Sequence, residues 1–153
     1  MKTIPYANLP IQEQELLRQT VKRLPRSLNK VTNPYTGAVA VTEKNYYFGN
    51  DIFLSNDTLI CAEAAAMASA VAAGDYKFTK LCLAIGRTDS EPRIVSPCGN
   101  CRQWLHDFAR PNGRVIEVLS VTSMLNNVMI TDSDELLPEG FKSAGLGKMA
   151  GES

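Results

Sequence analysis

The sequence predicts an α/β fold, a three-layer α-β-α sandwich around a mixed five-stranded sheet. Helix-like and strand-like segments follow the order α-β-β-α-β-α-β, with one further edge strand after the last. One strand-like segment, residues 81–85, is apolar at every position, which is typical of a sheet covered by helices on both faces. The length of 153 residues fits a single domain that spans 1–153.

The first elements along the chain are a helix and a hairpin. Apolar residues recur at roughly helical spacing between Pro10 and Pro25, which predicts an amphipathic helix. Residues 37–41 and 46–48 are strand-like segments separated by the polar stretch 43–45. This pattern predicts two strands joined as a β-hairpin.

Two further helices are expected. The Ala-rich residues 61–73 predict the first of them, with N-cap chemistry at 55–58 and Gly74 suited to the position after its C-terminus. Cysteine, tryptophan, leucine and phenylalanine form an apolar stripe along 101–108, and the breakers at 111–113 end that helix.

The remaining strands lie near the C-terminus. Residues 115–119 predict one strand, and residues 128–130 predict an edge strand. After Leu136 the chain is rich in glycine and lysine, and we expect its last dozen residues to be mobile.

The composition limits the partners of the protein. Lysine plus arginine and aspartate plus glutamate both number 16, so no net charge attracts a nucleic acid polymer or an anionic membrane. No apolar run is long enough to cross a membrane, and the first ten residues lack the pattern of a secretory signal. We therefore expect a cytoplasmic protein that acts on a small molecule.

Three cysteines predict a metal site. Cys61 and the pair Cys98 and Cys101 each lie at the expected start of a helix, where backbone N–H groups and the helix dipole favour thiolate. In a reducing compartment, closely spaced cysteines are more often metal ligands or reactive groups than disulfides. Two helix starts that meet can present three thiolates to one Zn²⁺.

A fourth ligand is not evident. Cys82 lies inside the apolar strand, where it is expected to be a buried small hydrophobe. The only histidine, His106, turns away from Cys101 on the same helix and is expected at the surface or behind the site. Structural zinc sites are closed by four ligands, whereas catalytic sites keep one position for water. Three cysteines therefore favour a catalytic zinc.

Glu63 completes the predicted chemistry. It follows Cys61 by two residues, and its neighbours in the Ala-rich segment are apolar, which argues against an ordinary solvated glutamate. Zinc lowers the pKa of a coordinated water to near neutrality, and a carboxylate beside it can move protons to a leaving amine without binding the metal.

The combined motif resembles a known family. Cys-Ala-Glu at 61–63 together with Ser-Pro-Cys-Gly-Asn-Cys-Arg-Gln at 96–103 is similar to the small zinc cytidine deaminases with three cysteine ligands. The resemblance implies a hydrolase of cyclic C–N bonds, in which backbone around Ala62 and Pro97 holds the amine and the ring edge. The Leu-Leu-Pro segment before Phe141 resembles the homotetrameric members, in which an aromatic residue enters a neighbouring subunit's pocket.

The family's ribose-binding stretch is altered here. Where the family has Asn-Val-Glu-Asn, this chain has Gly-Asn-Asp-Ile-Phe at 49–53, so Ile52 or Phe53 replaces the ribose glutamate. Asn50 or Asp51 is expected to hold one hydroxyl, and Phe53 favours an apolar or flat group. Loss of the glutamate removes charge-assisted hydrogen bonds to paired hydroxyls.

Two other positions also depart from the family. The base-stacking phenylalanine is missing, although Tyr35 is adjacent to its expected place. The arginine that follows the catalytic glutamate in many members is Ala64 here, as in the blasticidin S deaminases. Arg102 is expected to hydrogen-bond a sulfur and to offset the thiolate charge in its place.

Several functions are compatible with these residues. The favoured one is zinc-dependent hydrolytic deamination of a cytidine-like nucleoside or a related aminated heterocycle, with a blasticidin S-type antibiotic, a free base or a modified base as alternatives. A zinc module without enzymatic activity is the competing class. A redox pair of Cys98 and Cys101 is a third, which leaves Cys61 and Glu63 unexplained.

Overall fold

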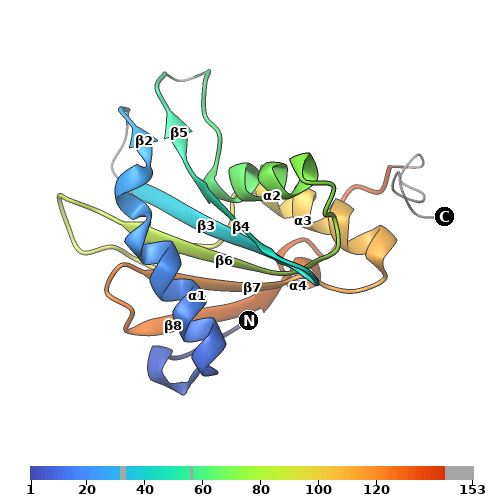
Figure 1. Ribbon diagram of the computed structural model, residues 1–153, viewed down its shortest axis with the longest axis horizontal. Helices are drawn as coiled ribbons and strands as arrows, with labels where there is room; N and C mark the ends of the chain where they lie inside the picture. The colour runs from blue at the N-terminus through green and yellow to red at the C-terminus, as the bar shows by residue number, and fades with distance from the viewer. Residues whose placement is uncertain (32–33, 56, 144–153) are drawn as a thin grey trace.

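The structure is a computed structural model that describes residues 1–31, 34–55 and 57–143. A six-stranded mixed sheet forms its centre, in the spatial order β1-β8-β7-β6-β3-β4 (Figure 1). Its strands are β1 (Lys2–Pro5), β3 (Tyr35–Thr42), β4 (Tyr46–Asn50), β6 (Phe78–Gly86), β7 (Glu117–Thr122) and β8 (Asn127–Asp132). The helices are α1 (Ile11–Lys22), α2 (Ala62–Ala72), α3 (Gly99–Asn112) and the short α4 (Ser133–Leu136).

Helices cover both faces of the sheet, which confirms the predicted α-β-α sandwich. One buried cluster joins Ala38, Ala40, Leu81 and Leu83 to residues of α2 and α3. A second cluster joins Val39, Cys82 and Ala84 to Leu17 of α1. Because successive side chains of a strand point to opposite faces, β3 and β6 feed both cores in alternation. We call these sides of the sheet the α2/α3 face and the α1 face.

The main sheet has one strand more than predicted. β1 pairs antiparallel with β8, so β8 is not the edge strand that its sequence suggested. β1 contains two polar residues and a proline and buries little of its surface, so its own sequence carries a weak strand signal. Its position depends on its pairing with β8, far along the chain.

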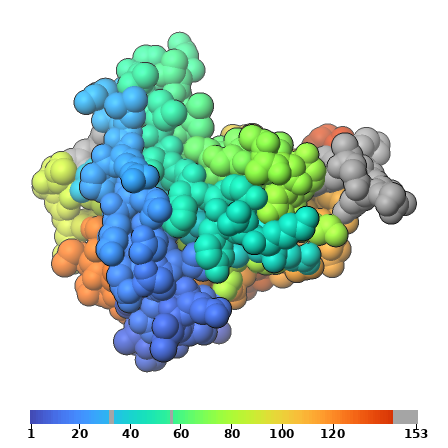
Figure 2. Space-filling view, viewed as in Figure 1, coloured from blue at the N-terminus to red at the C-terminus, as the bar shows by residue number. Residues whose placement is uncertain are grey.

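A second, two-stranded sheet lies outside the main one. β2 (Leu28–Asn29) pairs in parallel with β5 (Ile52–Phe53), and the backbone of Ile52 also pairs with Ile60. These segments project from the body of the molecule (Figures 1 and 2). The sheet lies just before the start of α2 and connects the end of β4 to the helix that carries Glu63.

None of the helices among the described residues is long and apolar enough to cross a membrane. The mobility expected for the last dozen residues concerns a segment of which residues 144–153 lie outside the described part of the chain.

Candidate metal centre and proton-transfer site

The cysteines occupy the starts of α2 and α3. Cys61 and Cys98 are the N-cap residues of these helices, and Cys101 lies in the first turn of α3. An N-cap side chain usually accepts a hydrogen bond from a backbone N–H of the first turn, but neither cysteine does so. The capping positions are therefore used to present sulfur. The predicted N-cap stretch at 55–58 instead closes a local turn, in which the Thr58 N–H donates to the Ser55 carbonyl.

The three sulfur atoms are close enough to share one metal ion. All three Sγ atoms lie within 4.8 Å of one another, and those of Cys61 and Cys98 are 3.5 Å apart. Tetrahedral zinc with Zn–S distances of about 2.3 Å places its sulfur ligands roughly 3.8 Å apart. The donor set and its spacing thus fit Zn²⁺, and the predicted meeting of the three cysteines is confirmed. Cys82 and His106 lie outside this cluster.

The cysteines differ in acidity. The Cys101 thiol, followed by that of Cys98, donates a hydrogen bond to the Cys61 sulfur and lowers the pKa of Cys61 to about 6, although burial opposes this. The same contact raises the pKa of Cys101. Cys82 is fully buried, as predicted, and burial raises the pKa of its thiol to about 12.

Glu63 lies in the first turn of α2 and is only 5% exposed. Its neighbours Ala62, Ala64 and Ala66 are also buried, and its carboxyl lies close enough to Cys61 for the charge of that thiolate to act on it. Burial raises the pKa of Glu63 to about 7, and the nearby charges of Cys61 and Asp51 act in the same direction. A buried carboxyl that can hold or release a proton is the type of group that proton transfer requires.

Gly49 determines how closely α2 approaches the sheet, and sequence reasoning did not identify it. A Cβ atom at this position would lie 2.3 Å from the Ala66 nitrogen and 2.5 Å from the Ala62 oxygen. Since both are backbone atoms, any side chain there would push the start of α2 away from β4. The sequence does show a glycine in β4 and an Ala-rich helix after it. It does not show that the two pack together, and without that contact the glycine cannot be interpreted.

Arg102 holds the loop that precedes Cys98. Its guanidinium donates to the Pro97 carbonyl at 2.7 Å, to Ser96 Oγ at 2.6 Å and to the Leu136 carbonyl at 3.4 Å. Its hydrogen bonds to the described residues thus go to oxygen atoms and not to a sulfur, which corrects the contact expected for it. The arginine instead fixes the position of one ligand-bearing loop against the C-terminal segment.

The substrate-binding residues expected from the sequence fall into two groups. Ala62 and Pro97 are buried beside the cysteines that follow or precede them, and Phe53 is half-buried in β5. Phe141 is 73% exposed, and its carbonyl accepts a hydrogen bond from Gln103 of α3 at 2.9 Å. The exposed Phe141 side chain and part of the Phe53 side chain thus remain available to a substrate or to another chain, whereas Ala62 and Pro97 lie buried beside the cysteines.

The side chains of Asn50 and Tyr35 lie on the α1 face of the sheet, opposite the face that carries the cysteines. The Asn50 side-chain amide donates to the Arg23 carbonyl at 2.9 Å and to the Thr36 carbonyl at 3.2 Å. The Tyr35 ring lies against Gly86 and packs on the α1-face core. The cysteine cluster lies on the α2/α3 face, which corrects the expectation that these two side chains contact the substrate.

The Asp51 carboxylate takes part in hydrogen bonds within the fold. The residue is 5% exposed, and its carboxylate accepts hydrogen bonds from Ser27 Oγ, from the Thr36 N–H at 2.9 Å and from Asn29 Nδ2 at 3.1 Å. These bonds tie β2 to the start of β3. The expected hydrogen bond from Asp51 to a substrate hydroxyl is corrected accordingly, because both carboxylate oxygens already have internal donors.

Comparison with known proteins agrees with this geometry. Residues 10–116 match the family described as the cytidine and deoxycytidylate deaminase zinc-binding region. The chain belongs to this family. That membership confirms the expected fold, the zinc-type site and the assignment to deaminases, hydrolases of C–N bonds.

Individual relatives show the range of the family. Blasticidin-S deaminase of Bacillus cereus is 34% identical over 84 residues, a match that covers 52% of this chain and about half of that protein, 55% of its length. Cytidine deaminase of Mycoplasma genitalium is 26% identical over 134 residues, which cover 84% of this chain and 95% of the relative. The crystal structure of cytidine deaminase from Burkholderia pseudomallei is 25% identical, with a TM-score of 0.71 over 87% of this chain and 100% of that one.

Proposed function

We propose that the protein is a zinc-dependent hydrolytic deaminase that acts on a cytidine-like nucleoside or a related aminated heterocycle and releases ammonia. The observation that carries this proposal is the meeting of three cysteine sulfurs, within 4.8 Å of one another, beside the buried carboxyl of Glu63. Zinc held by Cys61, Cys98 and Cys101 would lower the pKa of a coordinated water and so supply the nucleophile at neutral pH.

Glu63 carries the protons in this proposal. Its carboxylate accepts a proton from the attacking water and delivers it to the ring nitrogen next to the amine-bearing carbon. Glu63 then takes the proton of the hydroxyl group now on that carbon and passes it to the amine, so that the C–N bond breaks, ammonia leaves and the ring carbonyl of the product forms. Burial of Glu63 keeps bulk water from competing for these protons. Backbone groups at Ala62 and Pro97 hold the amine and the ring edge.

The test is ammonia release from zinc-loaded protein on a panel of cytidine, deoxycytidine, cytosine, blasticidin S, aminopurines and aminotriazines. Turnover of at least one compound that disappears on zinc removal and returns with zinc supports the proposal. Zinc bound with full occupancy and no turnover of any compound contradicts it, and favours the zinc module without activity.

The panel also separates substrates within the class. Asn50 and Asp51 are engaged inside the fold, so neither offers the family's ribose contacts. The resemblance to a blasticidin-S deaminase favours blasticidin S as the alternative to cytidine. Turnover of blasticidin S or a free base well above that of cytidine would support the alternative.

A homotetramer with shared active sites and a cytoplasmic location are part of the same proposal. The exposed Phe141 side chain is held on α3 through its backbone and is free to enter a second copy. A reducing compartment keeps the free cysteines available for zinc. Light scattering measures the mass of the particle at assay concentration. A mass equal to that of one chain would contradict the proposed homotetramer.

A further inference from the structure

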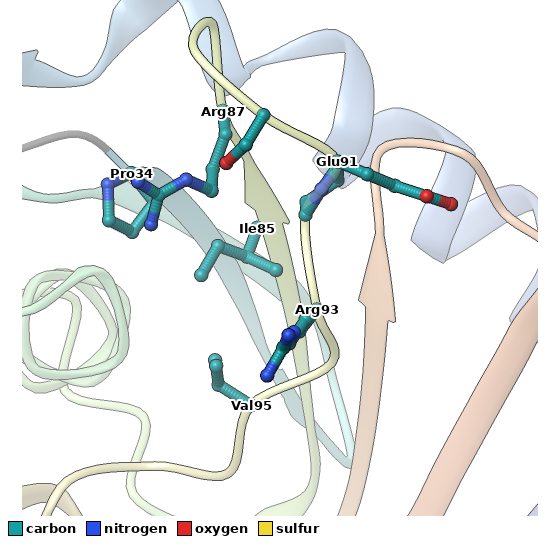
Figure 3. A pocket seen from close by; sticks show the side chains of 8 residues that line it. Pro34, Ile85, Arg87, Glu91, Arg93 and Val95 are labelled. Atoms are coloured by element: carbon teal, nitrogen blue, oxygen red, sulfur yellow. The ribbon is translucent and has the colours of Figure 1, made fainter.

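A hollow at the start of β3 and the end of β6 has no role so far. It has a volume of about 810 Å³ and is lined by residues from the start of β3, the end of β6 and the loop after it (Figure 3). The lining residues are Pro34, Ile85, Arg87, Ser90, Glu91, Pro92, Arg93 and Val95.

The strand register places this hollow on the α2/α3 face. Ile85 follows Leu83 by two residues in β6, and Leu83 belongs to the core under α2 and α3. Ile85 pairs with Thr36, which lies two residues before Ala38 of the same core and two residues after Pro34. The hollow therefore opens on the side of the sheet that carries the three cysteines.

The loop also links the hollow directly to a metal ligand. Val95 precedes Cys98 by three residues, so their Cα atoms are no more than about 11 Å apart even if the chain is fully extended. Arg102 fixes the intervening Ser96 and Pro97 through hydrogen bonds of 2.6 and 2.7 Å. A substituent on a ring bound at the cluster can reach the hollow.

The charges around the hollow leave one cation without a partner. Arg87 is neutralised by Asp89, with Nε and Nη2 each 2.9 Å from a carboxylate oxygen. Arg93 has no ion pair or hydrogen bond to any residue that the structure describes. In the view of Figure 3 the carboxylate of Glu91 points away from Arg93 and Ile85. The hollow thus presents an available guanidinium together with the apolar side chains of Ile85 and Val95.

We propose that this hollow is a subsite for an anionic substituent, a carboxylate or a phosphate, on the aminated heterocycle that is deaminated at the cysteine cluster, and this rests on the deaminase function proposed above. Arg93 binds the anion, and Pro34, Ile85 and Val95 contact the linking atoms. A planar guanidinium matches both anions because it can donate two parallel hydrogen bonds to either. The subsite replaces recognition of neutral hydroxyls, for which Asp51 is no longer free.

The first test uses product analogues, which bind without turnover. Calorimetry on the zinc-loaded protein compares uridine, uridine 5′-monophosphate and uridine 5′-carboxylate. We expect at least one anionic ligand to bind about tenfold or more tightly than uridine, and this advantage to fall at high salt. The anion with the larger advantage identifies the source, phosphate or carboxylate. Equal affinity of all three overturns the subsite.

Variants then assign the anion contact to Arg93. In Arg93→Gln the advantage of the anionic ligand should fall about tenfold, which leaves little or none of it, and Arg93→Glu should reverse it so that uridine binds more tightly. Arg114→Gln is the matched control, because Arg114 is a half-exposed arginine paired with Glu43 outside the hollow. Equal losses in Arg93→Gln and Arg114→Gln would show a general effect of surface charge and overturn the proposal.

Kinetics separates failure of the subsite from failure of the deaminase function. The ratio of kcat/KM for cytidine 5′-monophosphate or cytidine 5′-carboxylate to that for cytidine should fall about tenfold in Arg93→Gln. Turnover of these compounds with an unchanged ratio overturns the subsite alone. Absence of ammonia from every compound overturns the function, while the calorimetry still decides whether Arg93 binds the anion.

Discussion

Two regions of the molecule meet at the candidate site, and they use their polar side chains in opposite ways. At the starts of α2 and α3, Cys61 and Cys98 make no capping hydrogen bonds, and their sulfur atoms converge with that of Cys101. At the end of β4, Asn50 and Asp51 resemble ligand-binding residues in the sequence, yet their side chains are spent on hydrogen bonds within the fold. A polar residue in a family-like position is a binding group only if its hydrogen-bonding capacity is still free.

The largest effect is expected in the first region. Glu63→Gln keeps the shape of the side chain but cannot carry a proton, so kcat should fall about 100-fold or more. Zinc should stay at one ion per chain, since the three sulfurs are unchanged. Ammonia release with metal analysis on the same sample measures both. Full turnover in this variant would remove Glu63 from the proton transfer, and loss of zinc would show that the carboxyl supports the metal site instead.

Gly49 provides the next test, because it sets the position of α2 but not that of α3. In Gly49→Ala the new Cβ would meet the Ala66 nitrogen at 2.3 Å, and we expect the free energy of unfolding to fall by about 2 kcal/mol and Tm by roughly 5 °C. Gly99→Ala is the matched control at the start of α3, where a Cβ meets nothing within 4 Å. Thermal and denaturant unfolding compare them, and equal stability of the two variants would contradict the close packing of α2 on β4.

These two residues also mark what could be predicted from the sequence. The cysteines and Glu63 were identified because their signal is local: residue type, short spacing and a helix start. The role of Gly49, the α1-face orientation of Tyr35 and the pairing of β1 depend on contacts between distant segments. His106 is a further case: it lies outside the cysteine cluster and is buried, and Gly140, from beyond α4, lies against its ring.

Asp51 tests whether the second region is structural. In Asp51→Asn one acceptor becomes an amide donor that faces the donors at Thr36, Asn29 or Ser27, so the free energy of unfolding should fall by about 1–2 kcal/mol. Asp57→Asn is the control, because Asp57 is an exposed aspartate in the segment between β5 and α2. Denaturant unfolding measures the difference. Unchanged stability together with a raised KM would show that Asp51 binds the substrate. The second region would then contribute binding groups, as the first does.

Tyr35 gives the smallest expected effect and the sharpest check on which face carries the substrate. Its ring lies against Gly86 on the α1-face core, and the sheet separates it from the cysteine cluster. Tyr35→Leu should therefore cost stability, because a smaller side chain leaves part of the packing over Gly86 unfilled. It should change KM for the best substrate of the panel by less than about twofold, since no contact to the substrate is removed. Stability and KM are measured on the same preparation so that partial unfolding is not mistaken for weaker binding. A large rise in KM with little loss of stability would mean that the substrate reaches around the start of β3, and that the two faces of the sheet are not functionally separate at that edge.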